Sequence, residues 1–95
     1  MRGGWTYIMT NRPLGVLYVG VTANLAARVV QHRAGQGSEF CRRYNLTRLV
    51  LAEPHARIEE AIGREKALKA WQRGWKLALI EAANPEWDDL FERIL

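Results

Sequence analysis

Two tyrosines, an arginine and a histidine are the residues of this chain whose types and spacing could carry out chemistry. Tyr7 and Tyr18 lie in two aromatic and β-branched stretches separated by a turn, and Arg28 and His32 follow one helical turn apart. A guanidinium binds phosphate oxygens through a planar fork. An imidazole or a phenol can move a proton. The set therefore suits phosphodiester chemistry better than it suits packing.

The first predicted helix places Arg28 and His32 beside its apolar face rather than opposite it. At 100° per residue, both lie within about 60° of Leu25. A charged group turned toward the core costs free energy unless it has a partner or lines a cavity. The alternative is an arginine that extends to solvent and a histidine that is bonded to the backbone.

Glu65 is the candidate metal ligand because it falls inside the apolar stripe of a long predicted helix. The stripe is formed by Ile58, Ala61, Ile62 and Leu68. One carboxylate, completed by waters and phosphate oxygens, is typical of Mg²⁺ sites. The alternative is a buried ion pair with Lys69 or with an arginine.

The same stretch carries a basic stripe with aromatic residues interleaved. On one continuous helix the cations would span about 80° of arc; they are Lys66, Lys69, Arg73 and Lys76. Trp71 and Trp75 lie between them. Cations with nearby aromatics can hold a nucleic-acid backbone and stack on a base. The alternative is a solvated lysine face above core tryptophans.

Three strands are expected to support these residues. They cover residues 5–10, 16–20 and 46–52, with Pro54 ending the third. Residues 11–15 form the turn of a hairpin. Alternation places Trp5, Tyr7 and Met9 on one face, and the spacing of two places Tyr18 and Gly20 on a shared face.

Helices are expected at 23–34, 39–44, 56–72 and 75–83, with a break near residues 73–74. Thr22 and Ser38 are the expected N-caps of the first two. Asn84 and Pro85 end the last, and residues 87–94 form an amphipathic tail.

Composition bounds the remaining possibilities. The 95 residues are expected to form one domain, residues 1–95 with a core of about 5–90. The net charge of +4 permits an anionic partner without requiring one. Because no apolar run spans a bilayer, the N-terminus lacks a signal-peptide pattern and the lone Cys41 has no disulfide partner, we expect a cytoplasmic protein with no membrane association. Cys41 is expected to be a small buried hydrophobe.

Taken together, these motifs resemble a known family. Tyr7, then Tyr18-Val19-Gly20, then Arg28-x-x-x-His32 resemble the core of the GIY-YIG (URI) nuclease domain. The first motif is degenerate, reading Trp5-Thr6-Tyr7. The segments Arg64-Glu65-Lys66-x-x-Lys69-x-Trp71 and Asn84-Pro85-Glu86-Trp87 resemble the small stand-alone bacterial branch, and the match spans about residues 5–90.

The resemblance implies a compact α/β (α+β) fold, a three-stranded sheet with flanking helices. It implies an endonuclease that uses Mg²⁺ or Mn²⁺ to hydrolyse DNA phosphodiester bonds. In that scheme Tyr7 and Tyr18 are the pocket phenols, with the choice of general base left open. Arg28 binds phosphate, His32 assists proton transfer, and Glu65 binds the metal.

Further roles carry over less directly. Gly20 allows close backbone approach and Asn84 orients nearby groups, although Asn84 before Pro85 is also a simple helix terminator. Independently of the resemblance, the basic stripe is expected to bind substrate. Some relatives have a lysine directly after the second-motif glycine, where this chain has Val21.

We expect the substrate to be structured or damaged DNA in repair or recombination, with a second copy of the chain or a partner protein supplying the targeting. Two other functions remain open: a non-catalytic nucleic-acid-binding module that retains the fold, and a protein-interaction module. The protein-interaction module leaves Arg28, His32 and Glu65 unexplained.

Overall fold

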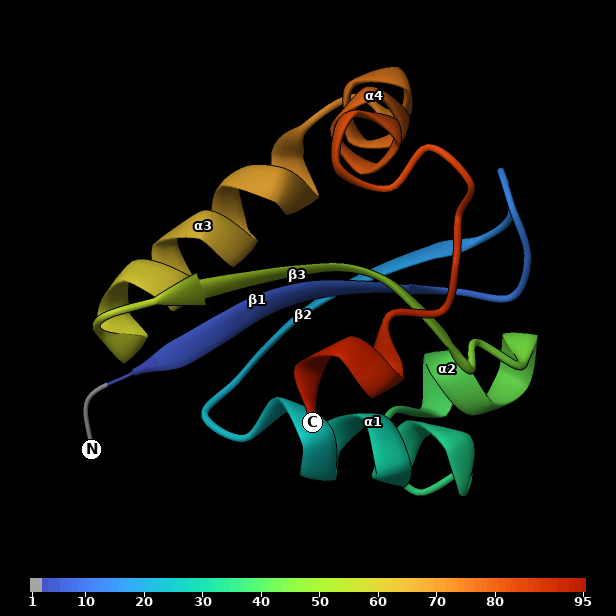
Figure 1. Ribbon diagram of the computed structural model, residues 1–95, viewed down its shortest axis with the longest axis horizontal. Helices are drawn as coiled ribbons and strands as arrows, with labels where there is room; N and C mark the ends of the chain where they lie inside the picture. Colours follow the sequence, from blue (N-terminus) through green and yellow to red (C-terminus); the bar gives the residue numbers. More distant parts are fainter. Residues whose placement is uncertain (1–2) are drawn as a thin grey trace.

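Three antiparallel strands form a sheet with helices on both faces in the computed structural model, which describes residues 3–95 (Figure 1). The strands are β1 (Gly4–Thr10), β2 (Leu17–Thr22) and β3 (Arg48–His55), in the order β2-β1-β3. The predicted fold class, an α+β domain with a three-stranded sheet, is confirmed. β2 and β3 are both edge strands, so each has one edge that is not hydrogen-bonded to a neighbouring strand.

The helices divide between the two faces of the sheet (Figure 1). α1 (Leu25–Arg33), α2 (Glu39–Tyr44) and the short 3₁₀ helix η1 (Phe91–Ile94) lie on one face. α3 (Ile58–Ala70) and α4 (Arg73–Ala83) lie on the other. None of the helices formed by residues 3–95 is long and apolar enough to cross a membrane.

Alternation along β1 builds a separate apolar cluster on each face of the sheet. Tyr7 and Met9 pack toward α1 and α2, with Leu25, Val29, Cys41, Leu46 and Leu49. Ile8 packs toward α3 and α4, with Val19, Val50, Leu51, Leu68, Ile80 and Trp87. Cys41 is buried and unpaired, as expected. The alternation predicted for residues 5–10 therefore determines which side chains can reach α1 and which can reach α3.

Two residues that were predicted to begin or end an element do not do so, for different reasons. Asn24, not Thr22, caps α1: the Asn24 side-chain oxygen accepts from the Ala27 backbone N–H at 3.2 Å, and Thr22 accepts from the N–H of Asn24. Pro54 does not end β3, which continues to His55. A proline is tolerated there because β3 is an edge strand that pairs only with β1.

The break between the last two helices lies at Trp71 and Gln72, not at residues 73–74. Both residues have extended backbone, and Gly74 instead lies in the first turn of α4. α4 therefore runs at a steep angle to α3 (Figure 1). As a result, the cations of α3 and α4 do not form the continuous stripe that one helix would give.

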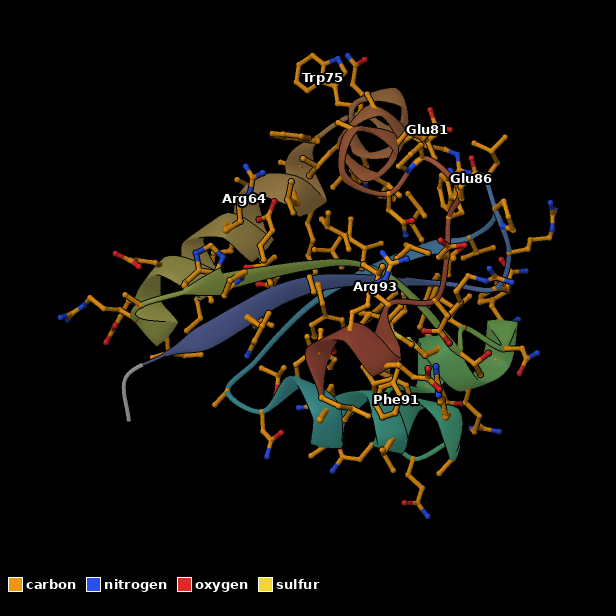
Figure 2. The ribbon with its side chains drawn as sticks, in the orientation of Figure 1. Arg64, Trp75, Glu81, Glu86, Phe91 and Arg93 are labelled. Atoms are coloured by element: carbon orange, nitrogen blue, oxygen red, sulfur yellow. The ribbon has the colours of Figure 1, made fainter. Side chains whose placement is uncertain are left out.

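The buried face of α3 is narrower than predicted. Ala61 and Leu68 are fully buried against the sheet, whereas Ile62 is 38% exposed, so its placement in the buried stripe is wrong. Trp71 is half-buried and Trp75 is exposed, pointing outward at the start of α4 (Figure 2). The alternative in which both tryptophans lie in the core is therefore wrong for Trp75, which is exposed.

Candidate active site

The hairpin of β1 and β2 brings the two phenols onto the face of the sheet that α1 covers. Tyr7 pairs with Gly20 and Met9 pairs with Tyr18, so the two tyrosines are diagonal neighbours with ring centroids 6.3 Å apart. A Cβ at Gly20 would lie 2.5 Å from the Tyr7 hydroxyl and 2.9 Å from the Tyr18 ring. Glycine is required at position 20 because the two phenols occupy that space.

Helix α1 then places an imidazole against Tyr7. A hydrogen bond of 2.9 Å joins Tyr7 Oη and His32 Nε2, and both side chains are buried. The phenol donates in the tautomer that carries its proton on Nδ1, and accepts in the other. The alternative of a histidine bonded to the backbone at Nε2 is therefore not observed. The His32 ring also meets the Tyr18 ring edge-on, with centroids 5.5 Å apart.

The other side of the imidazole is closed by the backbone of Gly37. A Cβ at Gly37 would lie 2.6 Å from His32 Nδ1. Within residues 3–95, Nδ1 is buried and has no hydrogen-bond partner. His32 is thus held by Tyr7 on one side and by bare backbone on the other.

Burial keeps both members of this pair uncharged at neutral pH. Burial raises the pKa of Tyr7 well above its ordinary value; Tyr18 adds to the rise and the Arg28 guanidinium opposes it. Burial lowers the pKa of His32, and Arg28 lowers it further. The bond therefore joins a neutral phenol to a neutral imidazole, with the positive charge of Arg28 close to both.

Arg28 itself is half-buried on α1. In the part of the chain that the structure describes, no carboxylate forms a salt bridge with its guanidinium. A half-buried cation without a protein counter-ion is able to bind an anion that arrives from solvent. A half-buried arginine without a salt bridge fits both interpretations that the sequence left open, and the anion-binding role of Arg28 stays a prediction.

Glu65 pairs with Lys69, which was one of the two arrangements that the sequence allowed. Lys69 Nζ lies 2.6 Å from Glu65 Oε2 along α3, and the Glu65 side chain is only 15% exposed. The bond to Glu65 raises the pKa of Lys69, and the proximity of Tyr18 adds to that rise. Glu65 also contributes to the raised pKa of Tyr7. The carboxylate therefore acts electrostatically on Tyr7, and its partner Lys69 is affected by Tyr18, although α3 packs on the other face of the sheet.

A cavity of about 310 Å³ lies where these elements meet at the β2 edge. Its walls come from β2, α2, α3 and α4 and are formed by Leu17, Tyr18, Val19, Phe40, Lys69 and Lys76. A larger cavity, of about 450 Å³, lies beside Trp5, Leu51 and the C-terminal tail and contains no predicted site residue. Only the smaller cavity combines a phenol with two ammonium groups, so we take it as the candidate site.

Among the predicted catalytic residues only Tyr18 lines this cavity; Tyr7, Arg28, His32 and Glu65 do not. Four predicted substrate-binding residues do not line it either, and the first of them, Gly20, lies against the rings of the two phenols. Lys66 is exposed on α3 and does not line it. Arg73 donates to the backbone oxygens of Leu14 and Gly15, at 2.8 Å each, and so holds the β1–β2 turn.

Asn84 is the fourth, and it lies on the opposite face of the sheet from Tyr7. Its amide nitrogen donates to the Val50 oxygen at 3.2 Å and to the Asp88 oxygen at 2.9 Å. Its amide oxygen accepts from the Asp88 N–H at 3.1 Å. Asn84 also ends α4, as the helix-terminator alternative proposed.

Comparison with known proteins adds an independent observation. Residues 3–78 match the family described as the GIY-YIG catalytic domain. The chain belongs to the GIY-YIG family. It therefore carries a nuclease-type catalytic domain.

The relatives of this GIY-YIG chain are small bacterial proteins. It is 37% identical over 65 residues to a UPF0213 protein of Staphylococcus haemolyticus, covering 68% of this chain and 79% of the relative. It is 36% identical over 67 residues to a UPF0213 protein of Staphylococcus aureus strain N315, covering 70% and 82%. A UPF0213 protein of Staphylococcus epidermidis strain RP62A is 33% identical over 67 residues. No solved structure shows a significant match.

The residues present limit which metal the site could hold. Among residues 3–95, no group of three or more histidine, cysteine, aspartate or glutamate side chains could hold an ion. Glu65 is a single carboxylate, with one oxygen bonded to Lys69. This donor set fits only a metal that keeps most of its ligands as water and phosphate oxygens, as Mg²⁺ does.

One aromatic residue of this GIY-YIG site was not predicted from the sequence. Phe40 lines the cavity and stacks on Tyr18, with centroids 6.2 Å apart and planes at 29°. The only signal in the sequence is its spacing of four from Tyr44, which places both rings on one side of a short helix.

Proposed function

We propose that this GIY-YIG chain is a divalent-metal-dependent endonuclease that hydrolyses DNA phosphodiester bonds on structured or damaged DNA, in repair or recombination. The observation that carries the proposal is the buried Tyr7–His32 hydrogen bond beside Arg28, which has no salt-bridge partner in the described chain. A pure binding module has no need of a buried phenol–imidazole pair.

Binding and orientation of the phosphate are assigned to cations from three helices. Arg28 would hold non-bridging oxygens of the scissile phosphate through its planar fork. Lys69 and Lys76 line the cavity and would hold flanking phosphates. Positioning of this kind supplies a large part of the barrier reduction in phosphoryl transfer.

Tyr7 is the phenol to which we assign the proton from the attacking water. A free tyrosine is a weak base at neutral pH because well under ~1% is phenolate. Burial raises the pKa of Tyr7 and makes a standing phenolate rarer still. Tyr7 can nevertheless accept a proton from water while donating its own to His32 Nε2, since His32 is neutral and bonded to it. Tyr18, which lines the cavity, is assigned to orienting the water and the phosphate.

Glu65 would hold the metal, with Mg²⁺ or Mn²⁺ as the candidates. When bound, the metal supplies charge stabilisation at the phosphate and at the leaving oxygen. Lys69 would remain beside it as a cation at the cavity wall.

A second candidate function is a nucleic-acid-binding module that has kept the fold without turnover. The Glu65–Lys69 ion pair favours it, because that pair accounts for the carboxylate without any metal. This candidate predicts salt-sensitive DNA binding that is indifferent to Mg²⁺.

The deciding experiment is incubation with a panel of flap, nicked, branched and single-stranded oligonucleotides, in Mg²⁺, Mn²⁺ or EDTA. The endonuclease predicts metal-dependent products from wild type and none from Arg28→Ala at equal concentration. Binding without products on every substrate would favour the second candidate. Absence of both binding and products at low salt would overturn both.

A further inference from the structure

The α2 wall of the cavity carries a series of aromatic rings that runs outward from Tyr18. Phe40 stacks on Tyr18, and Tyr44 packs on Phe40 with centroids 4.9 Å apart. Phe40 is 41% exposed and Tyr44 is 42% exposed. Phenylalanine is among the residues most often buried, so a ring half in water beside a cavity is informative.

The fold of α2 holds these rings in place. Ser38 caps the helix by accepting from the Cys41 backbone N–H, and Cys41 is buried against the sheet. Asn45 ends the helix in the left-handed conformation, with φ of 59°. Because Cys41 anchors one side of α2, its other side presents Phe40 and Tyr44 to solvent in a defined orientation.

The charges around the rings indicate what could cover them. Lys69 and Lys76 line the same cavity as Phe40, and the Arg43 guanidinium lies 5.7 Å above the Tyr44 ring. Ring faces flanked by cations match a planar base joined to phosphates, and they match an aliphatic peptide or a lipid chain less well.

We propose that Phe40, extended by Tyr44, is the base-stacking platform of this site. The base of a nucleotide next to the bound phosphate leaves its own stack and lies on the Phe40 ring, while Lys69 and Lys76 hold the phosphates. The platform rests on the proposed function because the site must bind a DNA phosphate. Stacking does not require that this phosphate be cleaved. A base that is unpaired, or that can be extruded, is therefore a requirement of the site.

The test measures binding in EDTA at low salt, so that cleavage cannot contribute. An oligonucleotide carries 2-aminopurine at one unpaired position at a time, flanked by abasic sites so that the probe has no base neighbours. Quenching of its fluorescence then reports stacking on a protein ring. Phe40→Leu keeps an apolar side chain and removes the ring, whereas Phe40→Trp restores a ring. Phe91→Leu is the matched control, because Phe91 lies between η1 and α1, under the Arg33 guanidinium, and does not line the cavity (Figure 2).

The proposal predicts that wild type quenches one position strongly and that Phe40→Leu loses this quenching and binds about 10-fold more weakly. Phe40→Trp should keep both properties, and Phe91→Leu should bind as wild type does. Tyr44→Leu should show a smaller loss, of about threefold. Thermal unfolding of each variant verifies that it is folded at the assay temperature.

A double-mutant cycle separates stacking from an indirect effect through Tyr18. Replacing the quenched nucleotide by an abasic one should weaken wild type about 10-fold and leave Phe40→Leu unaffected. Additive losses from the abasic site and from Phe40→Leu would overturn the proposal, as would quenching that survives in Phe40→Leu.

The outcomes also distinguish this proposal from the proposed function. Normal binding and quenching with no metal-dependent product would count against the nuclease function and leave the platform standing. Wild type that binds no oligonucleotide at low salt would overturn the platform and leave the aromatic surface to a protein partner.

Discussion

At the scale of single residues, the site depends on the space that two glycines leave open. Gly20 makes room for the hydroxyl of Tyr7, and Gly37 makes room for the ring of His32. In the space that these glycines leave, Tyr7 Oη and His32 Nε2 lie 2.9 Å apart while both side chains stay buried. The Tyr-Val-Gly motif thus has a steric reason that does not depend on any comparison.

Gly20→Ala is predicted to disable the site with a modest effect on folding. The new methyl group must displace one or both phenols, and a displacement of about 1 Å lowers a catalytic rate by about 100-fold. The stability cost is expected to be about 1–3 kcal/mol, as for other over-packed cores. Single-turnover cleavage and urea unfolding measure the two effects.

Gly63→Ala is the control for that substitution. No atom lies within 4 Å of the position a Gly63 Cβ would take, and Gly63 is exposed inside α3. Alanine there should stabilise the chain by about 0.5–1 kcal/mol and leave the rate unchanged. Equal activity in both variants would contradict the steric account of Gly20.

The pH dependence of the cleavage rate should follow the protonation of the His32 imidazole. Its neutral form accepts the proton from Tyr7, and burial with Arg28 lowers its pKa below the ordinary 6.5. The rate should therefore rise with pH and level off with a midpoint below 6.5. A midpoint at or above 6.5, or an acid limb that persists in His32→Gln, would contradict this role.

The same group affects folding stability, with a defined sign. Because the unfolded state binds a proton at higher pH than the folded state, the contribution of His32 is complete above pH 6.5. It is lost as the pH falls through the lowered folded-state pKa. Urea midpoints in that window should fall less steeply with decreasing pH in His32→Gln than in wild type.

At the scale of elements, the cavity exists because α4 leaves α3 at a steep angle. Lys69 near the end of α3 and Lys76 in the first turns of α4 then line one cavity, whereas Arg73 binds the β1–β2 turn. The break at Trp71 and Gln72 was not predictable locally, because neither residue is a glycine or a proline. Its extended backbone accompanies the packing of Trp71 against the apolar cluster that contains Ile8 and Val50, residues distant in the sequence.

Arg73 and Lys76 should consequently respond differently to substitution. Lys76→Ala is expected to lower the slope of log K against log salt for DNA binding by about one, with little effect on stability. Arg73→Ala should leave that slope unchanged and destabilise the hairpin by about 1 kcal/mol, through two lost hydrogen bonds. A lowered salt slope in Arg73→Ala would restore it to the substrate-binding surface.

Other elements were predictable because their signals are local. The alternation of residues 5–10 and the turn at residues 11–15 predicted the hairpin, and with it the shared face of Tyr7, Tyr18 and Gly20. Glu65 was predicted inside the buried side of α3, and it is 15% exposed. The choice between its two partners, a metal or Lys69, needed the geometry. Phe40 was missed since nothing local marks a half-exposed ring on a six-residue helix as part of a site.

At the scale of the whole molecule, the C-terminal tail covers β3 on the sheet face that carries α3 and α4. Trp87 is buried with a left-handed backbone, φ 57°, and its carbonyl accepts from Arg48 at 2.8 Å. Asn84 connects the end of α4 to both β3 and the tail. Its burial far from the phenols assigns it to the tail rather than to a phosphate.

Asn84→Ala is accordingly predicted to be a stability variant. It removes three hydrogen bonds and leaves buried backbone groups unsatisfied, at a cost of about 2–4 kcal/mol. Below its unfolding transition, the affinity of the folded fraction for DNA should match that of wild type. A large loss of affinity at unchanged urea midpoint would instead support the substrate role that the sequence suggested.

The central claim is that the Glu65 carboxylate, Arg28 and the Tyr7–His32 pair serve one metal-dependent cleavage reaction. The most direct test is the single-turnover cleavage rate across a Mg²⁺ titration for wild type, Glu65→Gln and Glu59→Gln, the last altering an exposed carboxylate on the same helix. The account predicts saturable Mg²⁺ dependence in wild type and Glu59→Gln, and a loss of about 1000-fold in Glu65→Gln. An undiminished rate in Glu65→Gln, or equal cleavage in EDTA, would contradict it.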